Sequence, residues 1–91
     1  MSTKEKIQEQ VEVAEKQTSQ HEIILHNDEV NTFDFVIDAL VDVCEHTLVQ
    51  AEQCTILVHY KGKASVKHGE MSKLKPVCSK LLDMGLSAEI V

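Results

Sequence analysis

A run of polar side chains at residues 27–31, Asn-Asp-Glu-Val-Asn, separates two apolar stretches of the chain. The oxygens of the Asn, Asp and Glu side chains are hydrogen-bond acceptors, so this run could hold a cation that carries several N–H donors. Asn and Asp are also frequent turn residues, because their side chains bond the nearby backbone. Taken alone, the run is compatible with a cation site or with a plain turn.

His59 is a second group that could take part in binding. It lies near the end of a predicted helix, on which Thr55, Val58 and His59 share one face. A neutral imidazole offers one acceptor nitrogen and one donor N–H. An isolated histidine here is also compatible with a purely structural role at a helix end.

Neither catalysis nor metal binding is indicated by the sequence. No Ser or Cys stands in a recognisable nucleophile setting, and there is no glycine-rich phosphate loop. Five residues could offer metal ligands, but none belongs to a tight pair such as Cys-x-x-Cys or His-Glu-x-x-His; they are His21, His26, Cys54, His59 and His68. We expect a protein that is not an enzyme and holds no metal or other cofactor.

The polar run is positioned by a predicted strand before it and a predicted helix after it. Residues 21–26 form a short strand with a continuous apolar centre. Residues 32–46 form a helix, for which Asn31 is the expected N-cap. Its inward face is predicted to hold Phe33, Val36, Ile37, Leu40 and Cys44, and its opposite face carries an acidic stripe.

Four further elements follow along the chain. Thr47 opens a second helix with a capping box, and this helix runs to about residue 60, before Gly62. Residues 63–67 read as an edge strand, and the His-Gly pair after it as a turn. A third helix covers roughly residues 70–84, with Met71, Leu74, Cys78, Leu81 and Leu82 inward, and an alternating strand ends the chain.

The order strand–helix–helix–strand–helix–strand predicts an α/β (α+β) fold. Three short strands cannot stand alone, so we expect a small three-stranded antiparallel sheet packed against three helices. Residues 1–20 are polar and are expected to be a flexible N-terminal tail. Residues 21–91 then form a single core domain.

Composition narrows the range of partners. The chain has 91 residues, with 9 basic and 15 acidic side chains and a net charge of −6, which argues against nucleic acid as a partner. No segment has the ~18 apolar residues of a membrane span, and the start does not resemble a signal peptide. We expect a cytoplasmic protein whose three cysteines are reduced.

Two blocks of sequence together resemble the ClpS family, the adaptors that deliver substrates to the ATP-dependent Clp protease. They are Leu-His-Asn-Asp-Glu-Val-Asn-Thr-Phe-Asp-Phe-Val at residues 25–36 and Val-His-Tyr-Lys-Gly-Lys-Ala at residues 58–64. The first matches the family's Asn-Asp-Asp-x-Thr turn, and the second matches its Val-His-x-x-Gly-x-Ala helix end. The resemblance extends over about residues 21–91 and implies the compact α/β fold of that family.

The resemblance implies recognition of proteins that begin with a free Leu, Phe, Tyr or Trp, an N-degron in the N-end rule of protein degradation. By this resemblance Asn27, Asp28 and His59 bind the α-amino group, with Glu29 and Val30 as secondary residues. The first side chain would enter a hydrophobic pocket lined by Asn31, Phe33, Val36, Thr55, Val58 and Leu86. An α-ammonium offers three N–H donors, which suits three converging acceptors.

Four positions depart from the family pattern. Glu29 replaces the usual second Asp, and Asn31 replaces Thr. Phe33 and Thr55 stand where the family usually has Met, so one wall of the pocket is stiffer and another is smaller. We expect a reshaped pocket with an altered preference among the four residues, in a direction that the sequence does not give.

The resemblance also implies a protein partner, the N-terminal domain of a AAA+ Clp unfoldase. Tyr60, Lys61 and Lys63 are candidates for docking to it, although they are equally compatible with solvated surface residues. The alternative is a non-catalytic docking module of the same fold, such as an unfoldase modulator or a domain like that of the ribosomal stalk. Such a module would not recognise a first residue.

Overall fold

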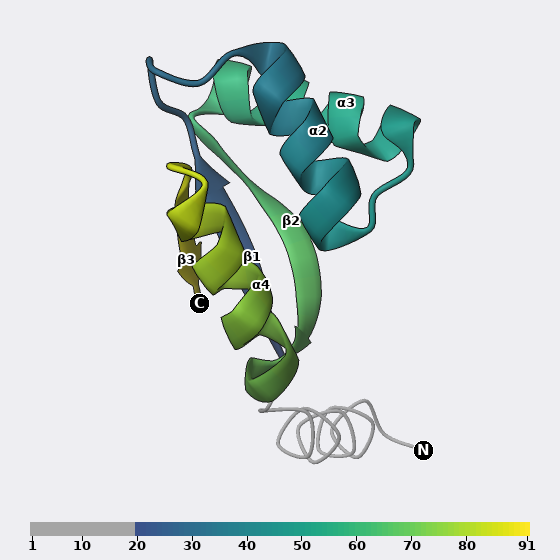
Figure 1. Ribbon diagram of the computed structural model, residues 1–91, viewed down its shortest axis with the longest axis vertical. Helices are drawn as coiled ribbons and strands as arrows, with labels where there is room; N and C mark the ends of the chain where they lie inside the picture. Colours follow the sequence, from purple (N-terminus) through teal and green to yellow (C-terminus); the bar gives the residue numbers. More distant parts are fainter. Residues whose placement is uncertain (1–19) are drawn as a thin grey trace, which may run out of the picture.

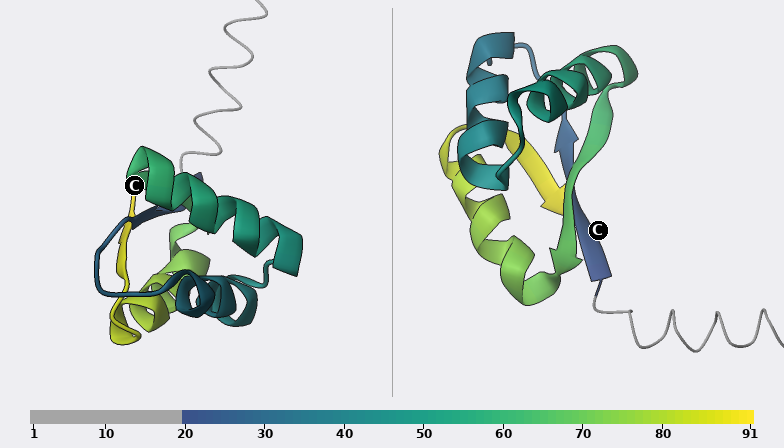
Figure 2. Two further views of the ribbon diagram at one scale, coloured as in Figure 1. Left: turned by 90° about the horizontal axis from the view of Figure 1, so that it is seen from above. Right: turned by 90° about the vertical axis from the view of Figure 1, so that its right-hand side faces the viewer.

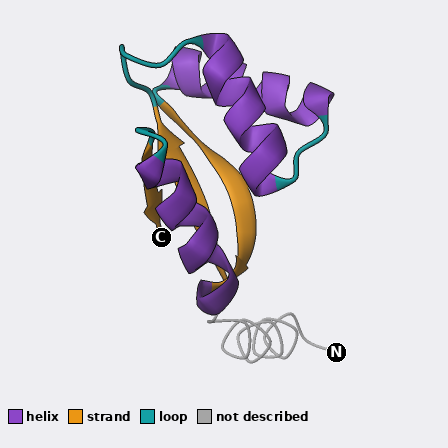
Figure 3. Ribbon diagram, in the orientation of Figure 1, coloured by secondary structure: helices purple, strands orange, loops and turns teal. Residues whose placement is uncertain are grey.

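An antiparallel sheet and three helices make up the computed structural model, which describes residues 20–91 (Figure 1). The elements are β1 (Gln20–His26), α2 (Phe33–Cys44), α3 (Leu48–Lys61), β2 (Lys63–Glu70), α4 (Met71–Asp83) and β3 (Ser87–Ile90). The predicted fold class and element order are therefore confirmed (Figure 3). The predicted N-terminal tail lies outside the described residues, except for Gln20, which begins β1.

β1 is the central strand of the sheet, whose strand order is β2-β1-β3 with both pairs antiparallel. Leu25 pairs with Ala64 of β2 on one side and with Ala88 of β3 on the other. β2 is an edge strand, as its lysines indicated. β1 is hydrogen-bonded to a strand on each side, so the position of its last residue is fixed. The polar loop begins at this fixed position.

The core lies between the helices and the face of the sheet that carries Ile23 and Leu25. These two side chains are fully buried together with Leu40 of α2 and with Leu74 and Leu81 of α4. α2 lies next to both α3 and α4, and α3 also packs on β2 (Figure 2). α2 and α3 are thus held against one another, and this contact positions the candidate site.

The N-cap of α2 is Thr32, and the prediction of Asn31 was wrong. The Thr32 hydroxyl oxygen accepts a hydrogen bond from the backbone N–H of Phe35 at 3.1 Å. The Asn31 amide is engaged with other acceptors, described below, and does not cap the helix. At its other end α2 stops at Cys44 because Glu45 adopts a left-handed conformation.

Both predicted ends of α3 are confirmed. The Thr47 hydroxyl accepts from the backbone N–H of Gln50 at 3.1 Å, and Gly62 ends the helix with a left-handed φ of 89°. The Gly62 carbonyl accepts from the backbone N–H of Asn27 at 2.8 Å. This bond ties the end of α3 to the first residue of the polar loop.

Two predictions in the second half of the chain were wrong. Residues 68–69 do not turn the chain, because β1 reaches back to Gln20 and supplies pairing partners for β2 as far as Glu70. Leu82 is 51% exposed, whereas its neighbour Leu81 is fully buried. Adjacent helical residues point about 100° apart, so both leucines cannot face the core.

Phe33 is also less buried than its place on the predicted apolar face implied, with 43% of its surface exposed.

No helix among residues 20–91 is both long enough and apolar enough to cross a membrane.

Candidate functional site

A cavity of about 340 Å³ opens between the loop that joins β1 to α2 and the last turns of α3. Its volume lies within the range of ~300–1,000 Å³ that is usual for ligand pockets. Nine residues line it: Asn27, Asp28, Glu29, Asn31, Thr32, Phe33, Thr55, Val58 and His59. The loop thus supplies one wall and α3 the other.

Burial distinguishes a closed end of the cavity from its mouth. Thr55 and Val58 are only 3% and 5% exposed and form the buried end. Asn27, Glu29 and His59 are exposed and lie at the mouth. The cavity therefore has polar groups at its entrance and the side chains of Val58 and Thr55 at its buried end.

The Asp28 carboxylate organises the loop. Its Oδ1 accepts hydrogen bonds from the backbone N–H groups of Val30 and Asn31, at 2.9 and 2.8 Å. Its Oδ2 accepts from the Asn31 side-chain amide at 2.9 Å. The pKa of Asp28 is lowered, mainly by the hydrogen bond from the Asn31 backbone N–H. Burial of the carboxylate acts in the opposite direction, whereas the bonds from the Asn31 side chain and the Val30 N–H lower the pKa further.

Asn31 connects this loop to a distant turn. Its Nδ2 group donates to Asp28 and also to the carbonyl oxygen of Gly85, at 3.0 Å. Gly85 belongs to the connection between α4 and β3, 54 residues further along the chain. The half-buried Asn31 amide therefore links the loop wall of the cavity to the connection between α4 and β3.

His59, at the mouth of the cavity, contacts two aromatic rings. Its ring centroid lies 5.1 Å from that of Phe33, with the two planes at 71°. Tyr60 approaches the same imidazole at 5.1 Å and 82°. Such edge-to-face contacts are favourable and limit the orientations of the imidazole.

Glu29 differs from Asp28 in having no side-chain hydrogen bond to any residue in the described part of the chain. It is exposed and lines the mouth of the cavity. Of the two adjacent carboxylates, one is used by the loop itself and the other is available to a ligand.

Eight residues that the sequence singled out line this one cavity: Asn27, Asp28, Glu29, Asn31, Phe33, Thr55, Val58 and His59. Three others do not line it. Val30 is 87% exposed, Leu86 is buried in the core, and Val36 is half-buried against the core. Thr32 lines the cavity and was not predicted; its position directly after the polar run, at the start of α2, was the signal that could have indicated it.

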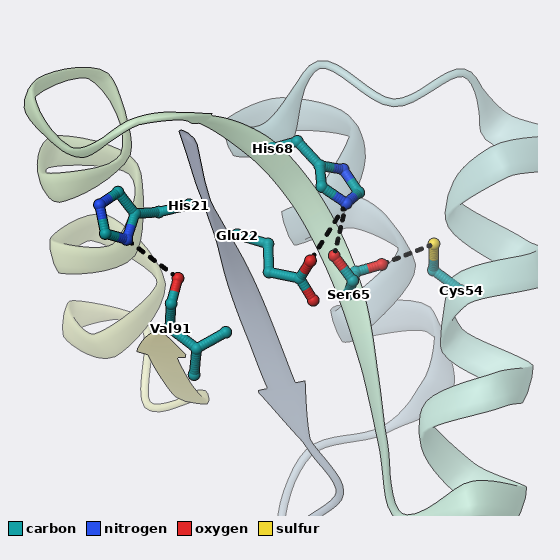
Figure 4. A network of polar contacts seen from close by, with 6 residues as sticks. All are labelled: His21, Glu22, Cys54, Ser65, His68 and Val91. Atoms are coloured by element: carbon teal, nitrogen blue, oxygen red, sulfur yellow. Dashed lines mark hydrogen bonds and ion pairs between the residues drawn. The ribbon is translucent and has the colours of Figure 1, made fainter. Parts of the chain in front are cut away.

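Away from the cavity, a group on the sheet superficially resembles a catalytic relay (Figure 4). The same nitrogen of His68, Nε2, lies 3.4 Å from the Ser65 hydroxyl and 3.4 Å from the Glu22 carboxylate. A relay requires the two imidazole nitrogens to serve opposite partners, so this geometry does not activate the serine. No cluster of three or more His, Cys, Asp or Glu side chains suited to a metal occurs among residues 20–91.

The fold and cavity define a small α/β domain with a candidate binding site between a strand–helix loop and a neighbouring helix. A family model described as the ATP-dependent Clp protease adaptor protein ClpS matches residues 16–89. The chain therefore belongs to the ClpS family of Clp protease adaptor proteins, which confirms the resemblance seen in the sequence.

Individual relatives agree with this assignment. The ClpS adapter of Shewanella halifaxensis is 39% identical over 59 residues, which cover 65% of this chain and 58% of that protein. The ClpS adapter of Sodalis glossinidius is 35% identical over 72 residues, covering 77% of this chain and 68% of that protein. The matched part of this chain thus spans about three fifths to two thirds of the length of these relatives.

A solved structure shares the fold. Agrobacterium tumefaciens ClpS2 bound to L-phenylalaninamide superposes with a TM-score of 0.72, covering 80% of this chain and 98% of that one. The two sequences are 18% identical in this alignment, so the likeness concerns the fold.

Proposed function

We propose that this protein is an adaptor that binds the free N-terminus of proteins beginning with Leu, Phe, Tyr or Trp and delivers them to a AAA+ Clp unfoldase. The observation that carries the proposal is the cavity, in which acceptor groups of the loop and His59 line the mouth, while Val58 and Thr55 form the buried end. The ligand of the related ClpS2 structure, L-phenylalaninamide, has the same two parts, an α-amino group and a large apolar side chain.

The α-ammonium would be held at the mouth by Asn27, by a ring nitrogen of His59 and by a carboxylate. Asp28 can contribute through Oδ2, which accepts one hydrogen bond, from the Asn31 amide, and has a second lone pair available. Glu29, without an internal partner among the described residues, supplies the unused negative charge beside it. We therefore propose that Asp28 chiefly stabilises the conformation of the loop and that Glu29 contacts the ammonium group of the ligand.

This arrangement discriminates against other chain segments. An internal residue or an acetylated N-terminus has no ammonium group, so acceptors covered by the ligand would remain unpaired at a cost of about 1–3 kcal/mol each. A β-branched first residue would crowd the loop next to the ammonium. Val and Ile should therefore bind less well than Leu.

The first side chain would fill the cavity towards Val58 and Thr55. Burial of an aromatic ring of ~150–250 Å² at ~25 cal/mol per Å² contributes roughly 4–6 kcal/mol before the costs of ordering are subtracted. Neither this term nor the ammonium alone gives tight binding. Together they support affinities in the micromolar range or better.

Delivery requires a contact with the N-terminal domain of the unfoldase. Tyr60 is 79% exposed, and Lys61 and Lys63 are exposed at the junction of α3 and β2. We propose this junction as a docking edge. Substitution of both lysines by Glu should weaken binding to the unfoldase domain while peptide binding is retained.

Fluorescence anisotropy with short peptides that differ only at residue one tests the proposal. The set is Leu, Phe, Tyr, Trp, Ile, Ala and acetylated Phe, measured on wild type, on His59→Ala and on His68→Ala. His68 is the matched control, because it is an exposed histidine on the sheet, outside the cavity. Binding of free Leu, Phe, Tyr or Trp that is lost on acetylation and weakened only by His59→Ala supports N-terminal recognition.

Binding that ignores the first residue would instead favour the alternative, a docking module of the same fold. The polar loop would then be only a turn that precedes α2.

A further inference from the structure

Two residues that line the cavity, Asn31 and Thr55, direct their side-chain N–H and O–H donors to other groups, so each side-chain oxygen keeps the capacity to accept a hydrogen bond. We propose that these oxygens, Asn31 Oδ1 and Thr55 Oγ1, make the pocket select first residues with a side-chain donor, so that Tyr and Trp bind more tightly than matched side chains without one. The inference rests on the proposed function and specifies the preference of that same site.

The first oxygen belongs to Asn31. Both hydrogens of its Nδ2 group are directed to groups that can only accept, the Asp28 carboxylate and the Gly85 carbonyl. This fixes which way the amide faces, because the opposite orientation would place its oxygen against two other oxygens. Oδ1 is therefore the amide atom without a hydrogen-bond partner among the described residues, and it belongs to a side chain that lines the cavity.

The second oxygen belongs to Thr55, at the buried end. Its hydroxyl donates to the carbonyl oxygen of Ala51, one turn earlier in α3, at 2.7 Å. With its hydrogen committed, Oγ1 retains only acceptor capacity. Thr55 lines the cavity at its buried end, so an occupant that reaches this end lies against it.

An occupant's own chemistry decides how well these oxygens are satisfied. The Tyr hydroxyl and the Trp indole N–H can donate to them, whereas Phe and Leu would cover them without a hydrogen bond. Sites that hydrogen-bond a ligand group reject analogues without it more strongly than apolar pockets reject a difference in size. A pocket with Met at position 55 would have no acceptor oxygen at its buried end.

The test compares ratios of affinities, because the α-ammonium contributes equally to both members of a pair. The pairs are Tyr with Phe and Trp with 3-benzothienylalanine, whose sulfur replaces the indole N–H. O-methyltyrosine is added as a peptide that is larger than Phe and has no donor. Dissociation constants are measured by anisotropy on wild type, Thr55→Val and Asn31→Ala.

In wild type, Tyr should bind about 3- to 10-fold more tightly than Phe, and Trp should exceed its sulfur analogue by a similar factor. Thr55→Val, which keeps the shape and removes the oxygen, should bring at least one of these ratios towards one. Asn31→Ala also disturbs the loop, so this variant should bind every peptide less tightly. The ratio of the Tyr and Phe affinities still reports on the loss of the Asn31 oxygen.

Three results would overturn the inference. They are equal binding of Tyr and Phe in wild type, O-methyltyrosine that binds as tightly as Tyr, and ratios that persist in both variants. If Phe and Tyr peptides bind and only the ratio fails, the pocket preference is wrong and N-terminal recognition stands. If no peptide with a free first residue binds, the proposed function fails and the preference falls with it.

Discussion

The two adjacent carboxylates of the loop should respond differently to the same chemical change. Asp28→Asn converts Oδ2 into an NH₂ group that faces the Asn31 NH₂ group, which donates to it in the wild type at 2.9 Å. One hydrogen bond is lost and two donors are brought together. Glu29→Gln removes a charge without disturbing any side-chain hydrogen bond among the described residues.

The magnitudes follow from these contacts. A lost hydrogen bond to a charged group costs up to about 1.5–3 kcal/mol, and because this loop is near the surface we expect about 1–2 kcal/mol of stability lost in Asp28→Asn. Glu29→Gln, a surface change, should alter the free energy of unfolding by less than about 0.5 kcal/mol. If Glu29 contacts the ammonium, the Glu29→Gln substitution should nevertheless weaken peptide binding about tenfold.

Urea denaturation measures the free energy of unfolding of each variant, and anisotropy with a Phe peptide measures its affinity for the ligand. Asp38→Asn is the matched control, because it removes one negative charge from an exposed position on α2, outside the cavity. The assignment of roles is refuted if Glu29→Gln binds like this control, or if Asp28→Asn abolishes binding with no loss of stability.

Three further predictions concern pH and the fold. Because the pKa of Asp28 is lowered in the folded state, its stabilisation is complete above the unfolded pKa of about 3.9 and is lost as pH falls through the lower folded value. In urea titrations the stability gap between wild type and Asp28→Asn should hold from pH 7 to about 5 and shrink below about 4; a gap that persists at pH 2 contradicts this. Gly62→Ala should cost about 1–2 kcal/mol through backbone strain alone, since φ is 89° and an added Cβ meets no atom within 4 Å; thermal unfolding would show it, and unchanged stability would exclude the strain. Leu74→Ala should cost about 2–5 kcal/mol by chemical denaturation, while Leu82→Ala, at a half-exposed position, should cost much less; equal losses would mean that the burial pattern of α4 is wrong.

Local patterns in the sequence were sufficient for the elements of this fold. Apolar runs and periodicities indicated the strands and helices, and Thr47 and Gly62 marked the ends of α3 correctly. Such signals act within one or two turns of the chain, so they can be read without knowing what packs against them. The same is true of the polar run that raised the possibility of a binding site.

Signals that depend on a partner segment misled the sequence reading. The extent of β2 was underestimated because its partner is the start of β1, some 50 residues earlier. The cap of α2 was assigned to Asn31, which has a suitable side chain, because the competing acceptors Asp28 and Gly85 are recognised only when the loops are in place. Leu81 and Leu82 are chemically identical, and only the packing of α4 decides which one is buried.

The sequence by itself therefore determined which residue types were available for binding and, through its resemblance to the ClpS family, which of them to consider together. Only the tertiary structure decided that the loop and His59 line one cavity, because this depends on the packing of α2 against α3 and on the bond between Asn27 and Gly62. It also decided which acceptors remain available. A side chain's unused hydrogen-bonding capacity is what remains after its neighbours are satisfied, and those neighbours are set by the fold.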